Sequence, residues 1–572
     1  MMQRRRYAEP AIVDGLARKP SQAGFVFRVM SLAAVTSLAL HIDPSAAASI
    51  CANLAGLSLP RTKVTLARSY QAGEVVSGVT RAPIGLCRVA GTSKPSRDSN
   101  IKFEVWIPTN GHWNGKYEQI GNGGFAGTIW VSYIADAVSR GYAAAATDDG
   151  TSGPPSGAAT FIGHPDVLKD FGHRAIKVTT DNSKAIIKRL TGKKPSYSYF
   201  SGCSDGGREA LMEAQRYPSD FDGIIVGSPA NDLVGLGASF LWNMQALLAG
   251  PQTDSVPDAY LPANKIALIS KLAISKCVGK DGGVSTDAFL NDPTNCHFDA
   301  AVAQCAAGQD PATCVTPAQV GAVERLYNGP HNSAGDLLFP GFEPGTGSNA
   351  TDWPQWLVGT SPTSPGSEYA LTAEFWCAAV LGKPTCPFLD LHGQFEIATR
   401  SIALMANSTD PDLAPFRSHG GKLIQYAGWA DSAIAPENGL NYYRKVTSVM
   451  GDVHDFYRVF MAPGMAHCYG GPGPNSFGNG NNHGPVIDAK HDLLKALEAW
   501  VERGTAPDKI IATKYFDDNP AKGVAFQRPL CPYPRISSYN GCGQISDPSS
   551  FECVHADIHP DPRNIGVQNA YK

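Results

Sequence analysis

The stretch Gly202-Cys203-Ser204-Asp205-Gly206-Gly207 decides how the chain is interpreted. It follows the strand-like residues 198–201 and precedes the helix-like run 208–216, so a Gly-x-Ser-x-Gly pattern stands at a strand-to-helix turn. Glycine on both sides of the serine removes Cβ atoms that would collide in so tight a turn. The pattern predicts that Ser204 is a nucleophile. A plain glycine-rich turn with a capping serine is the alternative interpretation.

Strand and helix signals alternate around this turn. Residues 101–107 alternate polar and apolar side chains, residues 170–190 carry apolar side chains at helical spacing, and residues 221–227 form another strand-like run. Strand-like runs return at 422–426 and 455–461. Such alternation is typical of a parallel sheet with helices on both faces.

The two strand-rich regions are separated by a long segment of different composition, rich in Gly, Pro, Asn, Thr and Cys. We therefore expect an α/β fold in which an α/β-hydrolase core carries a large inserted lid domain. The expected boundaries are 49–230 for the first segment of the core, 231–420 for the inserted lid domain, and 421–572 for the second segment of the core with a C-terminal extension.

A serine nucleophile needs a base, and the base needs an orienting acid. In α/β-hydrolases the acid and then the histidine follow the serine along the chain. Asp431 and His467 each stand just beyond a strand-like run, which predicts a triad of Ser204, Asp431 and His467. Asp452 and Asp455 compete for the acid role, but they precede a strand. The histidines without the required placement are His419, His454 and His483.

The composition is that of an ordinary globular protein. Of 572 residues, 43% are hydrophobic, and 48 basic residues balance 51 acidic ones. This is enough apolar material for a large core and a soft indication of two to four domains. Because a nucleic-acid partner needs a concentrated basic surface, we expect none.

The N-terminus has the pattern of an export signal. Basic residues extend to Arg28, residues 29–40 form an apolar stretch, and Pro44 and the small residues 46–48 follow. That stretch is too short to span a bilayer. We expect residues 1–48 to be a signal peptide, the mature protein to have no membrane partner, and its location to be secreted or periplasmic. A buried N-terminal helix is the alternative.

Thirteen cysteines fit an exported protein, because no CxxC pair occurs and oxidising compartments favour disulfides. Short separations suggest loop-closing pairs, and an odd count leaves at least one thiol over, with the partner of Cys542 open. The cysteines with short separations are Cys277 and Cys296, Cys305 and Cys314, Cys377 and Cys386, and Cys531 and Cys553; Cys51 and Cys87 are also expected in disulfides.

Three stretches resemble the tannase and feruloyl esterase family. They are GCSDGGREALMEAQRYPSDFDGIIVGSPA (202–230), APGMAHCYGGPG (462–473) and AFQRPLCPYPRISSY (525–539). The resemblance covers nearly all of the expected mature chain. It implies a secreted serine carboxylic ester hydrolase that acts through an acyl-enzyme on aromatic esters of hydroxycinnamoyl or galloyl type. The implied partner is a small-molecule or plant-polymer aromatic ester.

The resemblance also implies further features of the site. Cys203 and Cys468 match two family cysteines that form a disulfide beside the serine and the histidine, and two unpaired cysteines are the alternative. An oxyanion hole is implied from the amide of Asp205 and one in the loop 121–124, of which Gly121 is the first choice by position. A mere glycine turn is the alternative for that loop.

Family members bind a structural calcium in the lid through an aspartate-rich loop. The matching stretch here, residues 277–287, has Val278 at the first aspartate position and two extra residues before Asp287. Asp281 and Asp287 remain as hard oxygen ligands, so Ca²⁺ is the one cofactor expected, and no organic cofactor is. A solvated acidic turn is the alternative.

Substrate choice is expected to lie in the lid, where aromatic side chains could line a pocket. No arginine occurs from residue 326 to 399, so a bidentate carboxylate clamp is absent from that stretch. We therefore favour an aromatic ester with a neutral tail over a terephthalate-type monoester. The expected substrate-binding residues are Trp356, Tyr369, Trp376, Ala433 and Ile434.

Two hypotheses come from other classes. A catalytically silent wall- or glycan-binding protein on the same scaffold predicts a damaged triad, whereas all three residues are present. A secreted peptidase of the same fold would cleave peptides instead of aryl esters. Covalent labelling by a fluorophosphonate separates an enzyme from a binder, and turnover of aryl esters separates an esterase from a peptidase.

Overall fold

The computed structural model describes residues 49–153, 157–347, 349–390 and 400–556. All described residues belong to one compact unit. The expected signal peptide, residues 1–48, lies outside the described residues. No helix in the described part of the chain is long and apolar enough to cross a bilayer.

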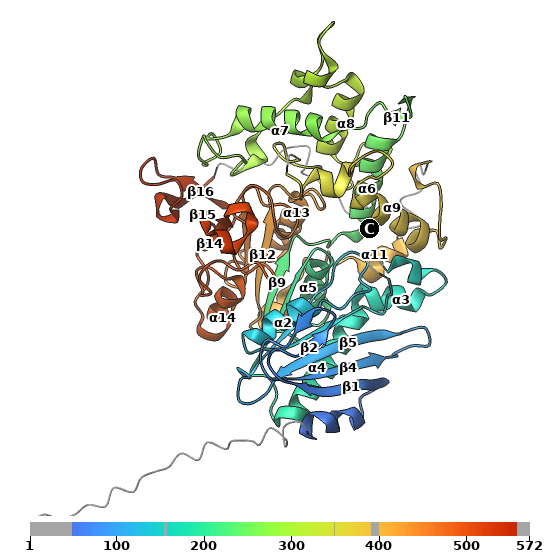
Figure 1. The fold of residues 1–572 in the computed structure, drawn as a ribbon, viewed down its shortest axis with the longest axis vertical. Coiled ribbons are helices and arrows are strands. Elements are labelled where there is room, and N and C mark those ends of the chain that lie inside the picture. The colour runs from blue at the N-terminus through green and yellow to red at the C-terminus, as the bar shows by residue number, and fades with distance from the viewer. Residues whose placement is uncertain (1–48, 154–156, 348, 391–399, 557–572) are drawn as a thin grey trace, which may run out of the picture. The chain divides into compact units, whose positions relative to one another are not determined.

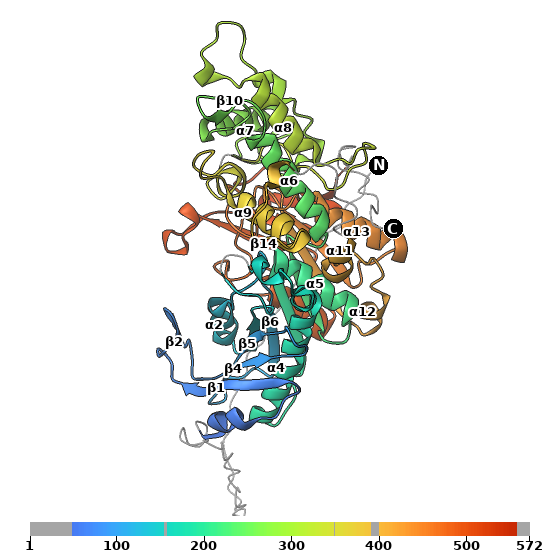
Figure 2. The same cartoon turned by 90° about the vertical axis from the view of Figure 1, so that its right-hand side faces the viewer.

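The fold is built on one mixed sheet of nine strands, which Figures 1 and 2 show in the lower half of the molecule. Its first strands are antiparallel, and from β7 through β13 all neighbours are parallel. In spatial order the strands are β1 (Thr62–Tyr70), β4 (Leu86–Ser93), β5 (Ile101–Pro108), β7 (Ala143–Thr147), β6 (Lys116–Ile120), β8 (Tyr197–Cys203), β9 (Gly223–Gly227), β12 (Lys422–Gly428) and β13 (Tyr457–Ala462).

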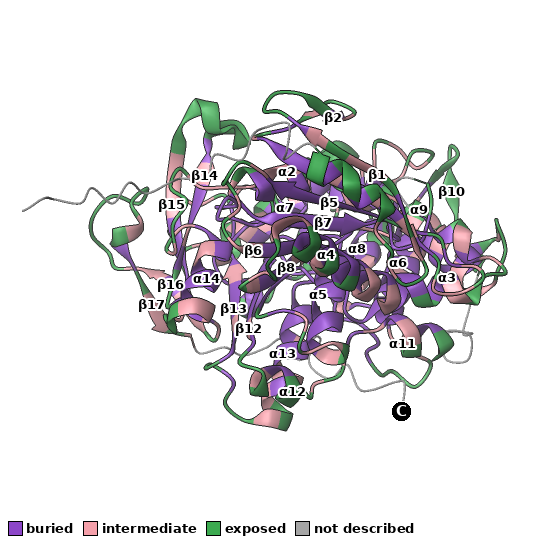
Figure 3. Cartoon of the chain, turned by 90° about the horizontal axis from the view of Figure 1, so that it is seen from below, coloured by how far each residue is buried: buried purple, intermediate pink, exposed green. Residues whose placement is uncertain are grey.

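Helices cover both faces of this sheet, as strand–helix alternation predicts. Apolar side chains of α4 (Ala175–Thr191), α5 (Asp205–Arg216) and α13 (Glu437–Met450) pack on one face. Those of α2 (Val131–Ser139) and α14 (Leu493–Arg503) pack on the other. Figure 3 shows the sheet as a buried layer between them. The α/β-hydrolase expectation is therefore confirmed for the described chain.

The segment between β9 and β12 alternates helices with irregular stretches, and its apolar side chains form one cluster with core residues such as Phe125 and Phe171. Figures 1 and 2 show its first helices at the end of the molecule opposite β1, while its last two helices lie beside helices of the core. The expected lid boundaries stay predictions, because the compact unit runs undivided from Asp43 through Lys572. The helices are α6 (Leu233–Leu248), α7 (Ala263–Cys277), α8 (Pro317–Asn328), α9 (Ser367–Ala373), α11 (Arg400–Ala406) and α12 (Ala414–Ser418).

The C-terminal residues form two hairpin-like pairs that pack beside the core. The remaining elements are short. The pairs are β14 (Ile510–Tyr515) with β15 (Val524–Leu530) and β16 (Arg535–Tyr539) with β17 (Phe551–His555); the short elements are α3 (Pro165–Lys169), β2 (Val75–Ser77) with β3 (Thr80–Arg81), and β10 (Gln252–Thr253) with β11 (Val256–Pro257).

Candidate active site

Ser204 occupies the sharp turn between β8 and α5. Its φ of 65° and ψ of −121° are a backbone conformation that residues other than glycine rarely adopt. A Cβ on Gly202 would lie 2.4 Å from the carbonyl oxygen of Gly206, and one on Gly206 would lie 2.8 Å from that of Asn122. The flanking glycines are therefore required sterically, and the turn presents the serine at the carboxyl end of the strand.

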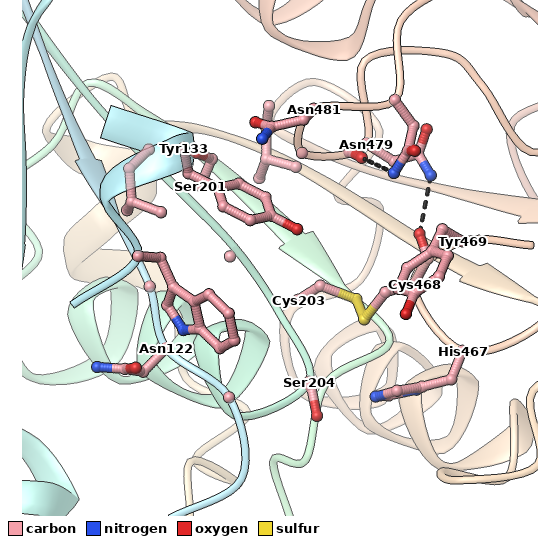
Figure 4. A pocket seen from close by; sticks show the side chains of 18 of the residues that line it. Asn122, Tyr133, Ser201, Cys203, Ser204, His467, Cys468, Tyr469, Asn479 and Asn481 are labelled. Carbon is pink, nitrogen blue, oxygen red and sulfur yellow. Dashed lines mark hydrogen bonds between the residues drawn. A yellow bond between two sulfur atoms is a disulfide. The ribbon is translucent and has the colours of Figure 1, made fainter. Parts of the chain in front are cut away.

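Asp431 and His467 follow the neighbouring strands β12 and β13, so both stand at the same edge of the sheet as Ser204. His467 Nδ1 lies 2.8 Å from Asp431 Oδ2, and both side chains are buried. A proton on Nδ1 is therefore donated to the carboxylate, which leaves Nε2 for the serine. In Figure 4 the imidazole extends toward the Ser204 hydroxyl. The structure thus brings the three expected residues together.

The Asp431 carboxylate is itself held in place by the backbone. Its Oδ1 accepts N–H bonds from Ala433 at 3.0 Å and Ile434 at 2.9 Å. Those two residues were expected to bind substrate, but both are buried in the lid-side apolar cluster and do not line the cavity described below. Their contribution is to orient the acid of the triad through main-chain donors.

The competing residues lie elsewhere. Asp452 is exposed and pairs with His454 at 2.8 Å, while Asp455 pairs with Arg417 at 2.7 Å on the surface. His483 lies between Asp492 and Asp136, 3.0 and 3.2 Å away. None of these groups contacts Ser204 in the described structure, which agrees with the choice of Asp431 and His467.

Six disulfides are present among the described residues. Cys203–Cys468 joins the residue before Ser204 to the residue after His467, with the two Cα atoms 6.0 Å apart. This bond ties the serine turn to the histidine loop, as the family resemblance implies, and Cys542 is an exposed free thiol. The other pairs are Cys51–Cys87, Cys277–Cys296, Cys305–Cys314, Cys377–Cys386 and Cys531–Cys553.

The oxyanion hole requires one correction. The amide of Asp205 opens α5 beside Ser204, as expected, but the amide of Gly121 donates to the carbonyl of Ser201 at 2.9 Å and continues the β6–β8 ladder. The amide of Asn122 is likewise engaged, at 2.7 Å from the Glu209 carboxylate. The amides of Gly123 and Gly124 donate to no described residue, so these two amides of the loop remain available to an oxyanion.

A buried acid cluster behind this loop escaped the sequence analysis. Carboxyl oxygens of Asp149, Asp205 and Glu209 lie within 4.8 Å of one another, and the fully buried Arg208 pairs with Asp205. Burial raises the pKa of Asp149 and of Glu209. Since Glu209 holds the Asn122 amide, the cluster fixes the oxyanion loop against α5. Only the packing of distant segments reveals it.

The residues expected to bind calcium do not fit that ion in this arrangement. Asp281 accepts N–H bonds from Gly283 at 3.1 Å and Asn291 at 2.5 Å. Asp287 accepts the Val284 amide at 3.1 Å and lies 3.1 Å from the guanidinium of Arg528. Hydrogen-bond donors therefore face the oxygens that would have to coordinate a cation.

A cavity of about 640 Å³ opens at the triad and is lined by Ser204, His467 and Trp356 among others. The Trp356 ring meets the His467 ring edge to face at 4.9 Å. Two other expected substrate residues do not line this cavity. Trp376 is buried and donates its indole N–H to Gly237, and Tyr369 lies at the surface against Phe388.

The comparisons with known proteins agree with this geometry. The family model of tannase and feruloyl esterase matches residues 87–554. An uncharacterized esterase from Xanthomonas campestris is 37% identical over 92% of this chain and 94% of its own length. A probable feruloyl esterase B-2 from Neosartorya fischeri is 31% identical over 87% of this chain and 90% of its own.

Solved structures show the same fold. Feruloyl esterase B from Aspergillus oryzae superposes with a TM-score of 0.80 at 25% identity, covering 89% of this chain and all of that one. Tannin acyl hydrolase from Aspergillus niger superposes with a TM-score of 0.69 at 22% identity, covering 92% and 96% of the two chains. This chain therefore belongs to the tannase and feruloyl esterase family and is a carboxylic ester hydrolase.

Proposed function

We propose that the protein is an exported serine esterase that cleaves aromatic esters of hydroxycinnamoyl or galloyl type through an acyl-enzyme. The observation that carries the proposal is the arrangement at the sheet edge. Ser204 stands at a turn that glycines make sterically feasible, and His467, held by Asp431, extends toward its hydroxyl. This is the geometry of an activated nucleophile with its base and orienting acid.

The reaction then proceeds in two transfers. His467 Nε2 takes the Ser204 proton while Oγ bonds to the ester carbonyl carbon, and Asp431 stabilises the imidazolium. The oxyanion is received by the amide of Asp205 and by that of Gly123 or Gly124. The ester C–O bond breaks, and the alcohol leaves with the proton from His467. Water repeats the sequence on the acyl-enzyme and releases the acid.

The preference for a neutral aromatic acyl group rests on the lid side of the cavity. Trp356, Ala370 and Leu371 line it there, and no arginine occurs from residue 326 to 399. An acyl group with a second carboxylate would find no bidentate partner on that side. The names of the relatives point the same way, and a terephthalate-type monoester is the alternative tested below.

Export is supported by two features. Six disulfides are typical of proteins that fold in an oxidising compartment. The N-terminal sequence has the order of a signal peptide. Together they favour a secreted or periplasmic enzyme.

The test combines labelling with a substrate panel. A fluorophosphonate should label the wild-type protein but not Ser204→Ala, whose thermal unfolding should match that of the wild type. Methyl ferulate and methyl gallate should be hydrolysed faster than a terephthalate monoester, and peptides should not be cleaved. Unlabelled wild-type protein would favour a silent binder. A clear preference for the terephthalate monoester would contradict the neutral-acyl assignment.

A further inference from the structure

The loop beside Ser204 is anchored at Asn122. The carbonyl oxygen of Asn122 accepts the Gly206 amide at 2.8 Å, and its side-chain amide donates to the Thr147 carbonyl at 2.6 Å. Its backbone amide donates to Glu209 Oε2 at 2.7 Å. Asn122 and Ser204 line the same cavity (Figure 4). The position of the amides that follow Asn122 therefore depends in part on the side chain of Glu209.

The carboxylate of Glu209 and the nucleophile belong to one rigid element. Glu209 lies on α5, and Ser204 is the N-cap of that helix. A Cβ on Gly121 would lie 2.9 Å from Glu209 Oε2, so the loop approaches the helix more closely than a side chain at that position would allow. The free amides of residues 123–124 come directly after Asn122. A shift of Asn122 would move them relative to Ser204, and small displacements at a reacting centre are costly.

A second buried carboxyl group faces Glu209. One carboxyl oxygen of each of Asp149, Asp205 and Glu209 lies within 4.8 Å of the other two, and Asp149 is fully buried. With both groups ionised, Asp149 Oδ1 and Glu209 Oε1 accept no hydrogen bond from a described residue. Two carboxylates so close together in a buried site repel each other, and carboxylates have no proton to donate. The pair therefore needs a neutralising group.

The nearby guanidinium does not neutralise this pair. Arg208 Nε lies 2.5 Å from one carboxylate oxygen of Asp205, and Nη2 lies 3.1 Å from the other. The remaining N–H groups donate to main-chain carbonyls, those of Phe171, Gly172 and Ala406. Every N–H group of the guanidinium is thereby engaged. Because Asp205 balances the charge of Arg208, Asp149 and Glu209 must be neutralised in another way.

One proton neutralises the pair and satisfies its oxygens. Burial, the charge of Glu209 and a hydrogen bond to Glu209 all raise the pKa of Asp149. Burial also raises the pKa of Glu209, but the hydrogen bond with Asp149 lowers it. The proton therefore lies on Asp149, which donates to the ionised Glu209.

We propose that Asp149 and Glu209 share one proton, and that this carboxyl pair holds the amides of residues 123–124 in place for the oxyanion. Asp149 acts through Glu209, and Glu209 acts through the amide of Asn122. Neither acid lines the cavity, so both are positioning residues. The inference rests on the proposed function, because it assigns what holds the loop that receives the oxyanion when Ser204 attacks.

The test compares two substitutions that suit the backbone of Asp149. Its φ of 55° is left-handed, a conformation that Asn and Gly adopt more readily than other residues. Asp149→Asn replaces the shared proton by an amide N–H, so kcat on methyl ferulate should stay within about 3-fold of the wild type. Asp149→Gly removes the donor and should lower kcat about 30-fold, less than the loss of a whole oxyanion donor, with KM changed less than about 2-fold.

Glu209→Gln tests the other half of the pair. Its amide oxygen still accepts from Asn122 and its N–H group can donate to Asp149, so kcat should stay within about 5-fold of the wild type. Glu213→Gln is the matched control, because Glu213 is a fully buried acid one turn further along α5, and it should keep the wild-type kcat. Thermal unfolding checks that each variant is folded.

Two further readouts distinguish this role from a purely structural one. The rate of labelling by a fluorophosphonate should fall in Asp149→Gly about as much as kcat does, because the phosphoryl oxygen occupies the oxyanion position. The infrared difference spectrum between the wild type and Asp149→Asn at neutral pH should contain the carbonyl band of a protonated carboxyl group. No activity is needed for this second measurement.

Several outcomes would overturn the inference while the proposed function stands. They are a wild-type kcat in Asp149→Gly, an Asp149→Asn variant as impaired as Asp149→Gly, and a difference spectrum without the carboxyl band. Loss of kcat in EDTA, restored by a divalent cation, would show that a metal neutralises the pair and would also overturn it. If the wild type is neither labelled by the fluorophosphonate nor active on methyl ferulate, the proposed function fails first.

Discussion

The sheet core and the segment 231–420 differ in the ion pairs and disulfides that stabilise each of them. Described residues of that segment make two ion pairs, Arg417–Asp455 and Asp287–Arg528, and both reach partners outside it. The core carries buried pairs of its own, such as Arg208–Asp205. The segment instead has three disulfides that each close a short loop, Cys277–Cys296, Cys305–Cys314 and Cys377–Cys386.

Three buried acids of the segment differ from the Asp205 and Glu209 cluster of the core. In the core, Arg208 lies beside Asp205 and Glu209. In the segment, burial raises the pKa of Asp352, Glu368 and Glu374, and no cation pairs with them among the described residues. A long-range disulfide thus joins the serine turn to the histidine loop in the core, whereas the disulfides of the segment close local loops.

The largest effect is expected for the acid of the triad. Asp431→Asn should lower kcat by about 10⁴-fold, because the histidine then loses its oriented tautomer and the stabilisation of its charge. Asp352→Asn, a nearby buried acid of the segment, is the matched control and should stay within about 10-fold of the wild type. Steady-state kinetics on methyl ferulate measures both. A large loss of kcat in Asp455→Asn, together with wild-type kcat in Asp431→Asn, would contradict the assignment of Asp431 as the acid.

The next largest effect on kcat is expected from removing the Cys203–Cys468 disulfide. Cys203→Ala with Cys468→Ala should lower kcat about 100-fold at temperatures well below unfolding, because small displacements of the base are costly. The paired change avoids a free thiol that could pair with Cys542. Cys305→Ala with Cys314→Ala should instead affect mainly the melting temperature. Comparable kcat losses in the two double variants would erase the distinction between the regions.

A smaller catalytic effect is expected where the segment touches the triad. Trp356→Ala removes the ring packed on His467 and should lower kcat about 10-fold, whereas Trp356→Phe keeps a ring there and should lose less. The pH dependence of kcat should shift in the alanine variant only. Tyr369→Ala, outside the cavity, is the control. Identical behaviour of the alanine and phenylalanine variants would show that the ring does not position the base.

The buried acids predict how stability depends on pH. Burial raises the pKa of Asp352 from 3.8 to about 7. The stability that its neutral form contributes is fully present below pH 3.8 and is lost as the pH rises to 7, at about 1.4 kcal/mol per pH unit. Asp352→Asn should therefore flatten the loss of stability over this interval, measured by urea unfolding at a series of pH values. A steeper loss in the variant would contradict the assignment.

The smallest effect is expected from chelation. Arg528 and backbone amides donate hydrogen bonds to the carboxylates of Asp281 and Asp287. We therefore expect that neither EGTA nor added CaCl₂ changes the melting temperature. Scanning calorimetry measures both. Stabilisation by calcium, absent in Asp281→Asn, would restore the metal site that the family resemblance implies.

Local sequence patterns predicted the positions of Ser204, Asp431 and His467 in the candidate site. The turn at Ser204 needs glycines at fixed offsets, and strand-end positions bring Asp431 and His467 to one edge of a parallel sheet. The prediction that the Gly121 amide is the second oxyanion donor was wrong for a physical reason. Which amide of a loop stays free depends on hydrogen bonds to other segments. Trp376 was expected in the pocket because it is aromatic, yet aromatic side chains also fill cores.

The sequence by itself determined the strand–helix order, the serine turn and the order of the triad, since each depends on residues close together in the chain. Only the tertiary structure decided which amides face the oxyanion, that Arg528 reaches Asp287, and that Glu118 and Arg140 line one cavity with Ser204. Contacts between residues far apart in the chain depend on how the elements pack, and side-chain type alone does not encode them.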